Sequence, residues 1–390
     1  MNKVRVGVVG LGNIGSTHTQ YLSEMDNVVL AGVCDIVKEK ADDYAMRYNS
    51  VAYYNHKDMI KNANLDAIII AVPHYDHTPI SIDAFEANLH VICEKPLAVH
   101  VNDAKKSIAA YEKAKVKNPE LVFAMEFQER TTAHYKKIKE ILDSGRLGKL
   151  VRVSWIDTTR FRTQTYFNSG GWRATWAGEG GGILTNQCPH SLDMYQWLFG
   201  MPKTVNGFAN IGKYHDIEVE DEVTAYFEHE NGMVGHFIVS TGEAPGSNRL
   251  EIMGENGKLV YENNKLIFNQ NTVSMLDVLQ KSKELFPVVE NWETVIPIDY
   301  SAPRGHRVVA EKFFKSVIDK NEDLIAHGTQ GLNSVMLANA IMLSSFKKSE
   351  VTLPMDGDEF EAKLKELIKN SRFVKTVDED AIVDMGNSFA

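Results

Sequence analysis

Cysteine is scarce in this sequence of 390 residues, which contains only Cys34, Cys93 and Cys188, far apart from one another. Three scattered cysteines are too few for a disulfide framework or a zinc site, and they fit a reducing compartment. Long apolar runs are missing as well. None approaches the roughly 18 residues that a membrane-spanning helix needs, and the first, from Val4, is strand-like and ends in glycines. We therefore expect a cytoplasmic protein with no membrane partner.

The chain has no excess of positive charge. Lys and Arg total 42 against 52 Asp and Glu, which gives a formal net charge of -10. This balance predicts no nucleic-acid partner, although it leaves a local basic patch open. The remaining composition, 44% hydrophobic, 9% aromatic and 24% charged, is that of an ordinary globular protein, and the length predicts two domains.

In the first third of the chain, short apolar β-branched runs alternate with amphipathic helical stretches. Residues 65–72 (LDAIIIAV) are apolar nearly throughout, as expected for a central parallel strand buried on both faces. Strand–helix alternation of this kind predicts a doubly wound parallel sheet, that is, a Rossmann domain over residues 1–128. The expected strands are 4–9, 28–34, 51–54, 65–72, 90–93 and 121–125, with helices over 14–25, 38–48, 78–87 and 102–115.

After residue 127 the pattern changes, because most strands follow one another without helices between them. Two X-Asn-Gly triplets, 230–232 and 255–257, are hairpin signals. We therefore predict an α+β domain over residues 129–372, with a mixed, largely antiparallel open sheet, for substrate binding and oligomerisation. The expected strands are 150–157, 204–210, 223–229, 234–240, 250–254 and 258–261, with helices over 131–142, 304–319 and 331–346.

Two further expectations concern the outside of the molecule. An open sheet face commonly pairs with a copy of itself, so we predict a homodimer or homotetramer. Residues 373–390 carry Asp378, Glu379, Asp380 and Asp384 and are expected to form a poorly packed acidic tail.

The first turn of the chain reads Gly10-Leu-Gly12-Asn13-Ile14-Gly15, a G-x-G-x-x-G between a strand and a helix. Gly10 permits the tight turn, Gly12 lets the backbone approach a pyrophosphate, and Gly15 allows the helix to pack closely on the strand. The start of the helix, with Asn13 and Ile14, then offers unpaired N–H groups to the phosphates. This turn predicts a dinucleotide site.

The acidic residue of such a site is Asp35, at the end of the second strand and 20 positions after Gly15. Its carboxylate would accept a hydrogen bond from a ribose 2′-OH and repel a 2′-phosphate, which favours NAD over NADP. A nearby Lys38 could weaken this preference.

A first candidate for catalysis is Lys95, in the triplet Glu94-Lys95-Pro96. The triplet follows the strand that ends at Cys93, and a residue at the carboxyl end of a parallel strand faces the ligand crevice. Position alone is equally consistent with a surface cation.

A second candidate is His190, which follows a glycine run and Pro189, a residue suited to the first turn of a helix. Asp193 lies one turn later on the same face, where its carboxylate could hold the imidazole tautomer and restore the basicity that a helix N-terminus lowers. That arrangement suits a general base working near neutral pH. A histidine that caps the helix or belongs to the core is the alternative.

Aromatic and basic side chains concentrate in residues 155–176. Flat rings against C–H faces, with Arg donors for hydroxyls, would make a carbohydrate site. The alternative is that Trp155 belongs to the sheet core and the rest forms an interdomain or subunit contact. The other members of this stretch are Arg160, Phe161, Arg162, Tyr166, Phe167, Trp172, Arg173 and Trp176.

Taken together, these segments resemble one family, the Gfo/Idh/MocA oxidoreductases, which include glucose–fructose oxidoreductase and inositol dehydrogenase. The resemblance runs from the glycine turn through Val72-Pro73 and His77, the E-K-P triplet and residues 180–193 to residues 351–354. E-K-P combined with GGG-x₇-H-x₂-D is far more specific than either alone. It therefore favours the catalytic interpretation of Lys95 and His190.

The resemblance implies that Lys95 hydrogen-bonds the reacting oxygen, while His190 takes or returns its proton as hydride passes to or from NAD. Gln128 stands where the family usually has an Asn near the cofactor. The other implied cofactor residues are Val72, Pro73, His77, Glu94, Lys95, Trp172 and Arg173, and the expected substrate residues are Lys95, Arg160, Tyr166, Trp176, Asn186 and His190.

Two positions depart from the family pattern. Asn186 stands where Asp is common, and because Asn cannot accept a proton it is expected to orient the substrate or Lys95, leaving His190 as the only base. His74 stands where Asn is common and is expected to modify the cofactor pocket. His74 and His77 are three residues apart, but without a third candidate ligand we predict that they line the crevice and hold no metal.

The sequence therefore predicts an NAD-dependent oxidoreductase acting on a secondary hydroxyl of a sugar, sugar derivative or polyol. One alternative is an NAD-dependent glycoside hydrolase, which oxidises a sugar carbon transiently, eliminates the aglycone and reduces again. Asn186 is compatible with it. Another is a non-catalytic dinucleotide sensor, against which Lys95 and His190 argue because a sensor needs neither.

Overall fold

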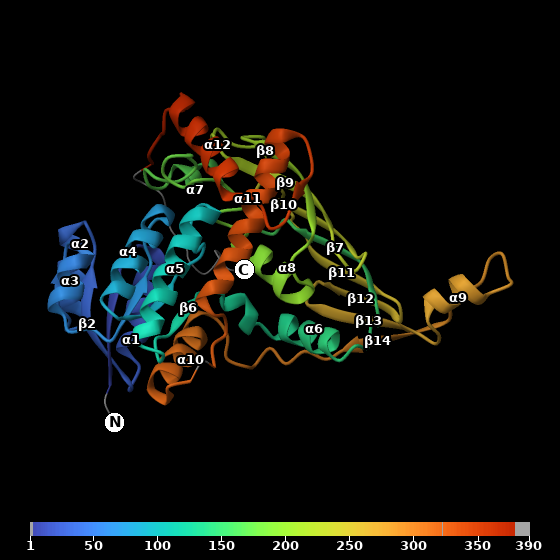
Figure 1. Ribbon diagram of the computed structural model, residues 1–390, viewed down its shortest axis with the longest axis horizontal. Coiled ribbons are helices and arrows are strands. Elements are labelled where there is room, and N and C mark those ends of the chain that lie inside the picture. Colours follow the sequence, from blue (N-terminus) through green and yellow to red (C-terminus); the bar gives the residue numbers. More distant parts are fainter. Residues whose placement is uncertain (1–2, 322, 379–390) are drawn as a thin grey trace.

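The computed structural model describes residues 3–321 and 323–378, and it contains two sheets (Figure 1). In this part of the chain, the N-terminal sheet has six strands in the order β3-β2-β1-β4-β5-β6, all parallel. Its strands are β1 (Val4–Val9), β2 (Val28–Cys34), β3 (Ala52–Tyr53), β4 (Ala67–Ile70), β5 (His90–Cys93) and β6 (Phe123–Met125). This order confirms the predicted Rossmann fold.

Helices cover both faces of the parallel sheet. The strand residues alternate: Ile68 and Ile70 belong to one core cluster and Ala67 and Ile69 to another, and none of the four is exposed. The unbroken apolar run at 65–72 arises because both faces need apolar side chains. The helices that precede β6 are α1 (Asn13–Ser23), α2 (Lys38–Arg47), α3 (His56–Asn62), α4 (His74–Glu86) and α5 (Val101–Lys117).

A later segment completes one of these faces. Helix α10 (His306–Asp319) places Ala310, Phe313 and Phe314 in the same core cluster as Val6, Val8 and helices α1 and α2. The Rossmann sheet is therefore covered partly by residues that lie about two hundred positions beyond its last strand. Figure 1 shows α10 beside α1.

The second sheet has nine strands among the described residues, in the order β14-β13-β12-β11-β7-β10-β9-β8-β15. Only β7 and β10 pair in parallel, so the predicted mixed, largely antiparallel sheet is confirmed. The strands are β7 (Leu150–Asp157), β8 (Thr204–Ile211), β9 (Glu220–Glu228), β10 (Val234–Ser240), β11 (Asn248–Gly254), β12 (Gly257–Glu262), β13 (Lys265–Asn271), β14 (Asn291–Ile296) and β15 (Val351–Thr352).

One face of this sheet carries the core and the other is open. Val153 and Trp155 of β7 are buried, whereas Phe208 of β8 is 66% exposed on the opposite face. Helices α6 (Ala133–Asp143), α8 (Pro189–Phe199) and α11 (Gly331–Lys347) lie on the buried face (Figure 1). Helix α11 also joins the two halves, because Asn339 bonds to the backbone of Val99 and Val101 before and within α5.

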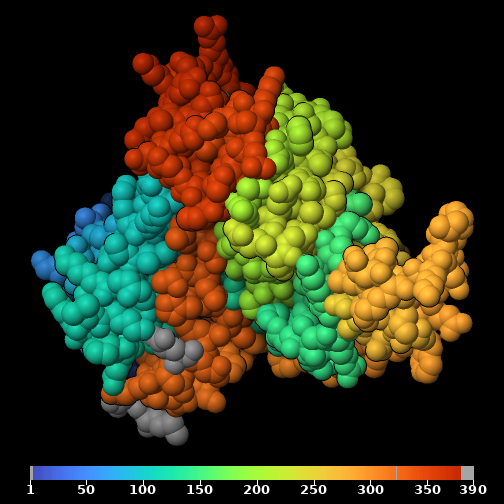
Figure 2. Space-filling model, turned by 45° about the vertical axis from the view of Figure 1, so that its right-hand side comes forward, coloured from blue at the N-terminus to red at the C-terminus, as the bar shows by residue number. Residues whose placement is uncertain are grey.

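Several elements were not predicted. They are the 3₁₀ turns η1 (Gln128–Thr131) and η2 (Gly328–Gln330), helices α3, α7 (Gln164–Asn168), α9 (Met275–Lys281) and α12 (Gly357–Asn370), and strands β13, β14 and β15. Helix α9 buries none of its side chains, and the segment around it protrudes at the right of Figure 2. Helix α12 had a readable signal, since Asp356 caps it and Phe360 and Leu364 are buried one turn apart.

Other differences lie at element ends and in the tail. Helix α4 begins at His74, one turn before the predicted start at residue 78, because Pro73 occupies the N-cap and Pro79 is tolerated within the helix. Residues 371–378 have no regular structure, but Asp378 N donates to Asn168 O at 3.1 Å, so this part of the predicted tail contacts α7. The acidic residues 379–390 lie outside the described residues. No described helix has the length and apolarity to cross a membrane.

Candidate functional site

The glycine turn joins β1 to α1, and each of its glycines meets a different environment. Gly10 has φ +87°, and a Cβ there would lie 2.2 Å from the Ala71 carbonyl oxygen. A Cβ on Gly15 would lie 1.9 Å from the carbonyl oxygen of Gly10, whereas one on Gly12 meets nothing within 4 Å. Gly10 and Gly15 therefore permit the turn and the close helix packing, while Gly12 leaves open space in front of the first N–H groups of α1, where a pyrophosphate fits.

Asp35 lies beside this turn at the end of β2. Its Oδ2 accepts a hydrogen bond from Leu11 N and its Oδ1 from Val37 N, both at 2.9 Å. These bonds hold the carboxylate in one orientation beside the glycine turn. The Lys38 amine instead lies over the Tyr54 ring, 5.2 Å from its centroid.

We expect Gly12→Ala and Gly15→Ala to separate cofactor binding from stability. The Gly12 variant should keep the wild-type melting temperature but bind NADH at least about tenfold more weakly, because its methyl group fills the open space. The Gly15 variant should be destabilised by about 1–3 kcal/mol, since its Cβ has no room. Thermal unfolding and fluorescence titration with NADH measure the two effects. Wild-type NADH affinity in the Gly12 variant would contradict the assignment.

The next two strand ends are joined by His77. Its Nδ1 lies 2.6 Å from Pro96 O and its Nε2 2.8 Å from Val72 O, and the side chain is buried. His77 thus holds the Val72-Pro73 loop after β4 against the loop after β5. His74, in the first turn of α4, directs Nδ1 to Glu179 O at 3.1 Å and packs against the Trp172 ring.

The loop after β5 sends its two charged side chains in different directions. Glu94 is buried and its Oε1 lies 2.8 Å from His18 Nε2 on α1, which holds the carboxylate within the Rossmann half. Lys95 instead reaches the second half of the protein, where its Nζ donates to Asn186 O at 2.9 Å. The pKa of Lys95 is lowered to about 8, mainly by burial. Arg160 and Arg173 lower it further, and Glu94 partly offsets this by raising it. The ammonium form therefore still predominates at neutral pH.

His190 lies at the start of α8, as predicted from Pro189. Burial lowers its pKa well below the usual value, and Lys95 and Arg160 lower it further, so the imidazole is neutral. Gln128 Nε2 lies 3.2 Å from His190 Nε2 and donates to it. Within the described residues, His190 Nδ1 is buried without a hydrogen-bond partner.

The predicted partnership of Asp193 with His190 is wrong. Asp193 accepts from Arg130 instead, through Nε to Oδ2 at 2.8 Å and Nη2 to Oδ1 at 2.6 Å, and both side chains are buried. A buried guanidinium needs a carboxylate, and the two groups of this pair neutralise each other. Asp193 therefore connects α8 to η1, and Gln128 is the residue that contacts the imidazole.

Asn186 lies in the loop before α8 and is the point where several site residues meet. Its main-chain carbonyl oxygen accepts a hydrogen bond from Lys95 Nζ, and its side-chain Nδ2 donates one to Glu179 Oε1. Glu179 is 1% exposed and was not predicted as a site residue. Its position directly before the glycine run at 180–182 is the only signal in the sequence that marks it.

The aromatic and basic stretch divides into two groups. Arg173 stacks on Tyr166 and Trp172, with its guanidinium carbon 4.8 and 4.5 Å from the ring centroids, and Nη1 donates to the Tyr166 hydroxyl at 2.9 Å. Arg160 lies close enough to lower the pKa of both Lys95 and His190. Trp176 is not brought to this group: its ring is 4% exposed and packs 6.3 Å from that of Phe346 on α11. Trp155 is buried in the sheet core.

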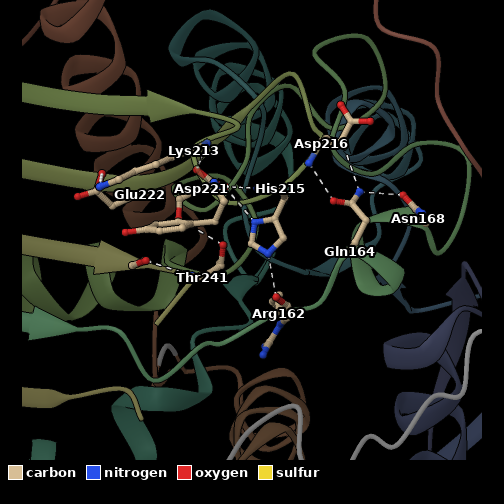
Figure 3. Close-up of polar contacts among 12 residues, drawn as sticks. Arg162, Gln164, Asn168, Lys213, His215, Asp216, Asp221, Glu222 and Thr241 are labelled. Atoms are coloured by element: carbon tan, nitrogen blue, oxygen red, sulfur yellow. Dashed lines mark hydrogen bonds and ion pairs between the residues drawn. The ribbon is translucent and has the colours of Figure 1, made fainter. Parts of the chain in front are cut away.

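The loop of residues 158–168 is held by a set of polar contacts, which we call the latch. The latch consists of Arg162, Gln164, His215, Asp216 and Asp221 (Figure 3). His215, between β8 and β9, places Nε2 2.9 Å from Arg162 O and Nδ1 2.9 Å from Asp221 Oδ2. Asp221 also accepts from the backbone amides of residues 213–215, and Gln164 bonds to the backbone of Asp216 at 2.9 and 3.2 Å. The latch therefore fixes residues 158–168 against the β8–β9 connection.

The latch should make stability depend on pH. The pKa of His215 is raised, because burial, which lowers it, is outweighed by the hydrogen bonds to Asp221 and Arg162 O. The pKa of Asp221 is lowered, because burial, which raises it, is outweighed by the hydrogen bonds from His215 and the backbone amides. Protonated His215 contributes to the stability of the folded protein. This contribution is fully present below the unfolded pKa of His215, about 6.5, and is lost as pH rises through the higher folded pKa. The Asp221 contribution is present above about 3.9 and is lost as pH falls through the folded value.

We therefore expect Asp221→Asn to cost about 2 kcal/mol near pH 5.5 and clearly less near pH 8.5. Thermal unfolding at the two pH values measures the difference. Asp216→Asn, which alters an exposed carboxylate of the same connection, is the control and should change little at either pH. An equal loss at both pH values in Asp221→Asn would rule out the charged pair.

Within the described residues, no three His, Cys, Asp or Glu side chains form a group that could hold a metal ion. The rings of His74 and His77 lie 6.0 Å apart, edge to face, near the crevice.

Two family models match this chain. The model described as the oxidoreductase family, NAD-binding Rossmann fold, matches residues 4–118. The model of the GFO/IDH/MocA C-terminal domain matches residues 135–260. The two matches cover the parallel sheet up to α5 and the second sheet from α6 to β12.

Several relatives are named as dehydrogenases. Myo-inositol 2-dehydrogenase of Thermotoga maritima is 25% identical over 272 residues, 67% of this chain and 75% of its own length. Levoglucosan dehydrogenase of Pseudarthrobacter phenanthrenivorans is 27% identical over 299 residues, 67% of this chain and 74% of its own. The WlbA dehydrogenase of Chromobacterium violaceum, solved with NADH and UDP-GlcNAcA, has a TM-score of 0.76 at 25% identity over 91% of this chain and 97% of its own.

Proposed function

The chain belongs to the Gfo/Idh/MocA family of NAD-binding oxidoreductases, and on that premise we propose that it oxidises a secondary hydroxyl of a sugar, sugar derivative or polyol. One observation carries the proposal: the half-buried ammonium of Lys95, at the carboxyl end of the parallel sheet, contacts Asn186 O in the loop before α8 and lowers the pKa of the buried, neutral His190 at the start of that helix. Oxidation of an alcohol needs a donor to the reacting oxygen and an acceptor for its proton, and these two groups supply them.

Each group has a distinct task in this proposal. Bound NAD supplies the hydride acceptor. The Lys95 ammonium, held by Asn186 O, donates a hydrogen bond to the reacting oxygen and stabilises the negative charge that develops there. Because His190 Nε2 accepts from Gln128 Nε2, the proton of the neutral ring lies on Nδ1 and Nε2 is the basic nitrogen. His190 therefore removes the hydroxyl proton at Nε2, where the substrate oxygen takes the place of the Gln128 contact. The alcohol thereby loses a hydride and a proton and becomes a ketone.

The second half supports a polyhydroxylated substrate. Tyr166 and Trp172 offer aromatic faces, and Arg160 and Arg173 offer guanidinium donors on the Lys95 side of the structure. Rings and Arg donors in one place suit the C–H faces and hydroxyls of a sugar. Relatives named for activity on inositol and levoglucosan agree with this substrate class.

NAD is the expected cofactor in preference to NADP. The Asp35 carboxylate is held by Leu11 N and Val37 N at the ribose position, and a 2′-phosphate there would meet a fixed negative charge.

A panel of free sugars, polyols and aryl glycosides, each incubated with NAD, tests the proposal. We expect NADH in stoichiometric amount from at least one free sugar or polyol. Release of the glycone from an aryl glycoside with no net NADH would contradict the proposal and support the redox-cycling hydrolase instead. If the protein binds NADH but turns over none of these compounds, the result would contradict the proposal and favour a non-catalytic dinucleotide sensor.

A further inference from the structure

Glu179 is a buried carboxylate that the mechanism above does not use. It lies in the loop between Trp172 and the glycine run, with 1% of its surface exposed. Its Oε2 accepts a hydrogen bond from Ala174 N at 2.6 Å, and its Oε1 accepts from Asn186 Nδ2 and lies 4.0 Å from Arg173 Nη1. Both oxygens are therefore committed to donors.

Positive charge surrounds this carboxylate. Burial raises the pKa of Glu179, while Arg173, Ala174 N, Asn186 and Lys95 oppose that rise because each stabilises the ionised form. Glu179 in turn raises the pKa of Lys95 against the effect of its burial. It is a negative partner of Arg173 and Lys95, whereas Arg160 pairs with Asp157.

The contact with Glu179 decides which way the Asn186 amide faces. Asn186 Nδ2 faces Glu179 Oε1, and the NH₂ group suits this place because an ionised carboxylate accepts hydrogen bonds and donates none. The Asn186 Oδ1 then points away from Glu179, and among the described residues it has no hydrogen-bond partner. The main-chain carbonyl oxygen of the same residue accepts from Lys95 Nζ at 2.9 Å, so the Asn186 side chain lies beside the lysine that donates to the reacting oxygen in the proposed function.

We propose that Glu179 is a positioning residue that fixes the Asn186 amide with Oδ1 toward the substrate, so that this part of the site selects a hydroxyl that donates a hydrogen bond. The inference rests on the proposed function and adds a substrate feature to it. Asn186 Oδ1 accepts a hydrogen bond from a hydroxyl on a carbon next to the oxidised one. A substituent that can accept a hydrogen bond but cannot donate one is disfavoured at that carbon.

Glu179→Gln turns the Asn186 amide around without changing the shape of either side chain. Ala174 N still needs an oxygen, so the oxygen of the introduced glutamine stays there and its NH₂ faces Asn186. Asn186 must then present Oδ1 to that NH₂ group and Nδ2 to the substrate. In the double variant Glu179→Gln/Asn186→Asp, the same NH₂ donates to one oxygen of the introduced aspartate, and the other oxygen restores an acceptor toward the substrate.

The test compares an accepted sugar or polyol with its deoxyfluoro analogues at the neighbouring carbons, because fluorine replaces the hydroxyl but cannot donate a hydrogen bond. The measured quantity is the ratio of kcat/KM for the parent to that for each analogue. Taking a ratio removes any general effect of the substitution on Lys95, NAD binding or the folded fraction. A purely structural role for Glu179 would leave the ratio unchanged.

We expect one carbon at which the wild-type ratio is large, and at that carbon Glu179→Gln should lower the ratio by about tenfold, the value of one hydrogen bond. The double variant should restore the wild-type ratio, and Asn186→Ala should lower it at the same carbon, which keeps the test open if Glu179→Gln folds poorly. An unchanged ratio in Glu179→Gln, or no restoration in a folded double variant that binds NADH, would overturn the role of Glu179 alone. If the wild type oxidises no sugar or polyol, the proposed function and this inference fall together.

Discussion

Lys95→Met is expected to lower kcat/KM for the sugar or polyol substrate about a hundredfold or more while NADH binding persists. Methionine has a similar length and fits the half-buried position, but it cannot donate to Asn186 O or to the reacting oxygen. His190→Ala is expected to have an effect of the same size, because no carboxylate in contact with His190 can take over as base: Asp193 is paired with Arg130. Steady-state kinetics with a fluorescence titration of NADH measure both effects.

Lys106→Met is the matched control for the lysine substitution. Lys106 lies on α5 with its side chain 60% exposed, and it forms an i,i+3 ion pair with Asp103. Its loss should leave kcat/KM unchanged. Near wild-type turnover in both Lys95→Met and His190→Ala would remove the acid–base assignment, whereas a loss in Lys106→Met as large as that in Lys95→Met would point to a general effect on the protein.

Arg130→Met is expected to cost about 3–5 kcal/mol of stability, because it leaves the Asp193 carboxylate buried and unpaired. The side chains of Arg130 and Asp193 are only 3% and 1% exposed. The guanidinium also donates through Nη1 to Gln330 Oε1 at 2.6 Å, so η1, α8 and η2 all lose a shared contact. Urea unfolding followed by circular dichroism measures the loss.

Two comparisons separate the buried charge from the loss of side-chain volume. Arg47→Met removes a half-exposed pair with Asp43 on α2 and should cost no more than about 0.5 kcal/mol. Arg130→Met/Asp193→Leu removes both buried charges and should be more stable than Arg130→Met alone. If Arg130→Met costs as little as Arg47→Met, the pair does not hold these elements together.

Local chemistry made much of the fold predictable. Strands β7 and β10 have the predicted bounds because alternating residues meet one core face and one open face, and periodicity of this kind is visible within eight residues. The Asn-Gly turns lie where the β9–β10 and β11–β12 hairpins reverse. Two of the missed elements, β14 and α9, have mostly exposed side chains and therefore no strong pattern.

Sequence motifs likewise located the centre of the site. The glycine turn, Asp35 and Lys95 each follow a parallel strand, and such strands end at one edge of a sheet whatever the rest of the chain does. His190 was predicted from Pro189 and from the resemblance to a family, and the structure places it near Lys95.

The sequence by itself made Lys95 and His190 candidates, because strand ends, helix starts and glycine spacing are properties of neighbouring residues, and the resemblance to a family then favoured their catalytic interpretation. Their partners could not be identified in this way. Asp193 was within one turn of His190, yet it pairs with Arg130, which lies 63 positions away and is buried beside it. Glu179 and Asn186, and Trp176 and Phe346, likewise meet only in the folded chain. Only the tertiary structure decided these pairs, since a buried charge or ring takes whichever complementary group packing brings within reach.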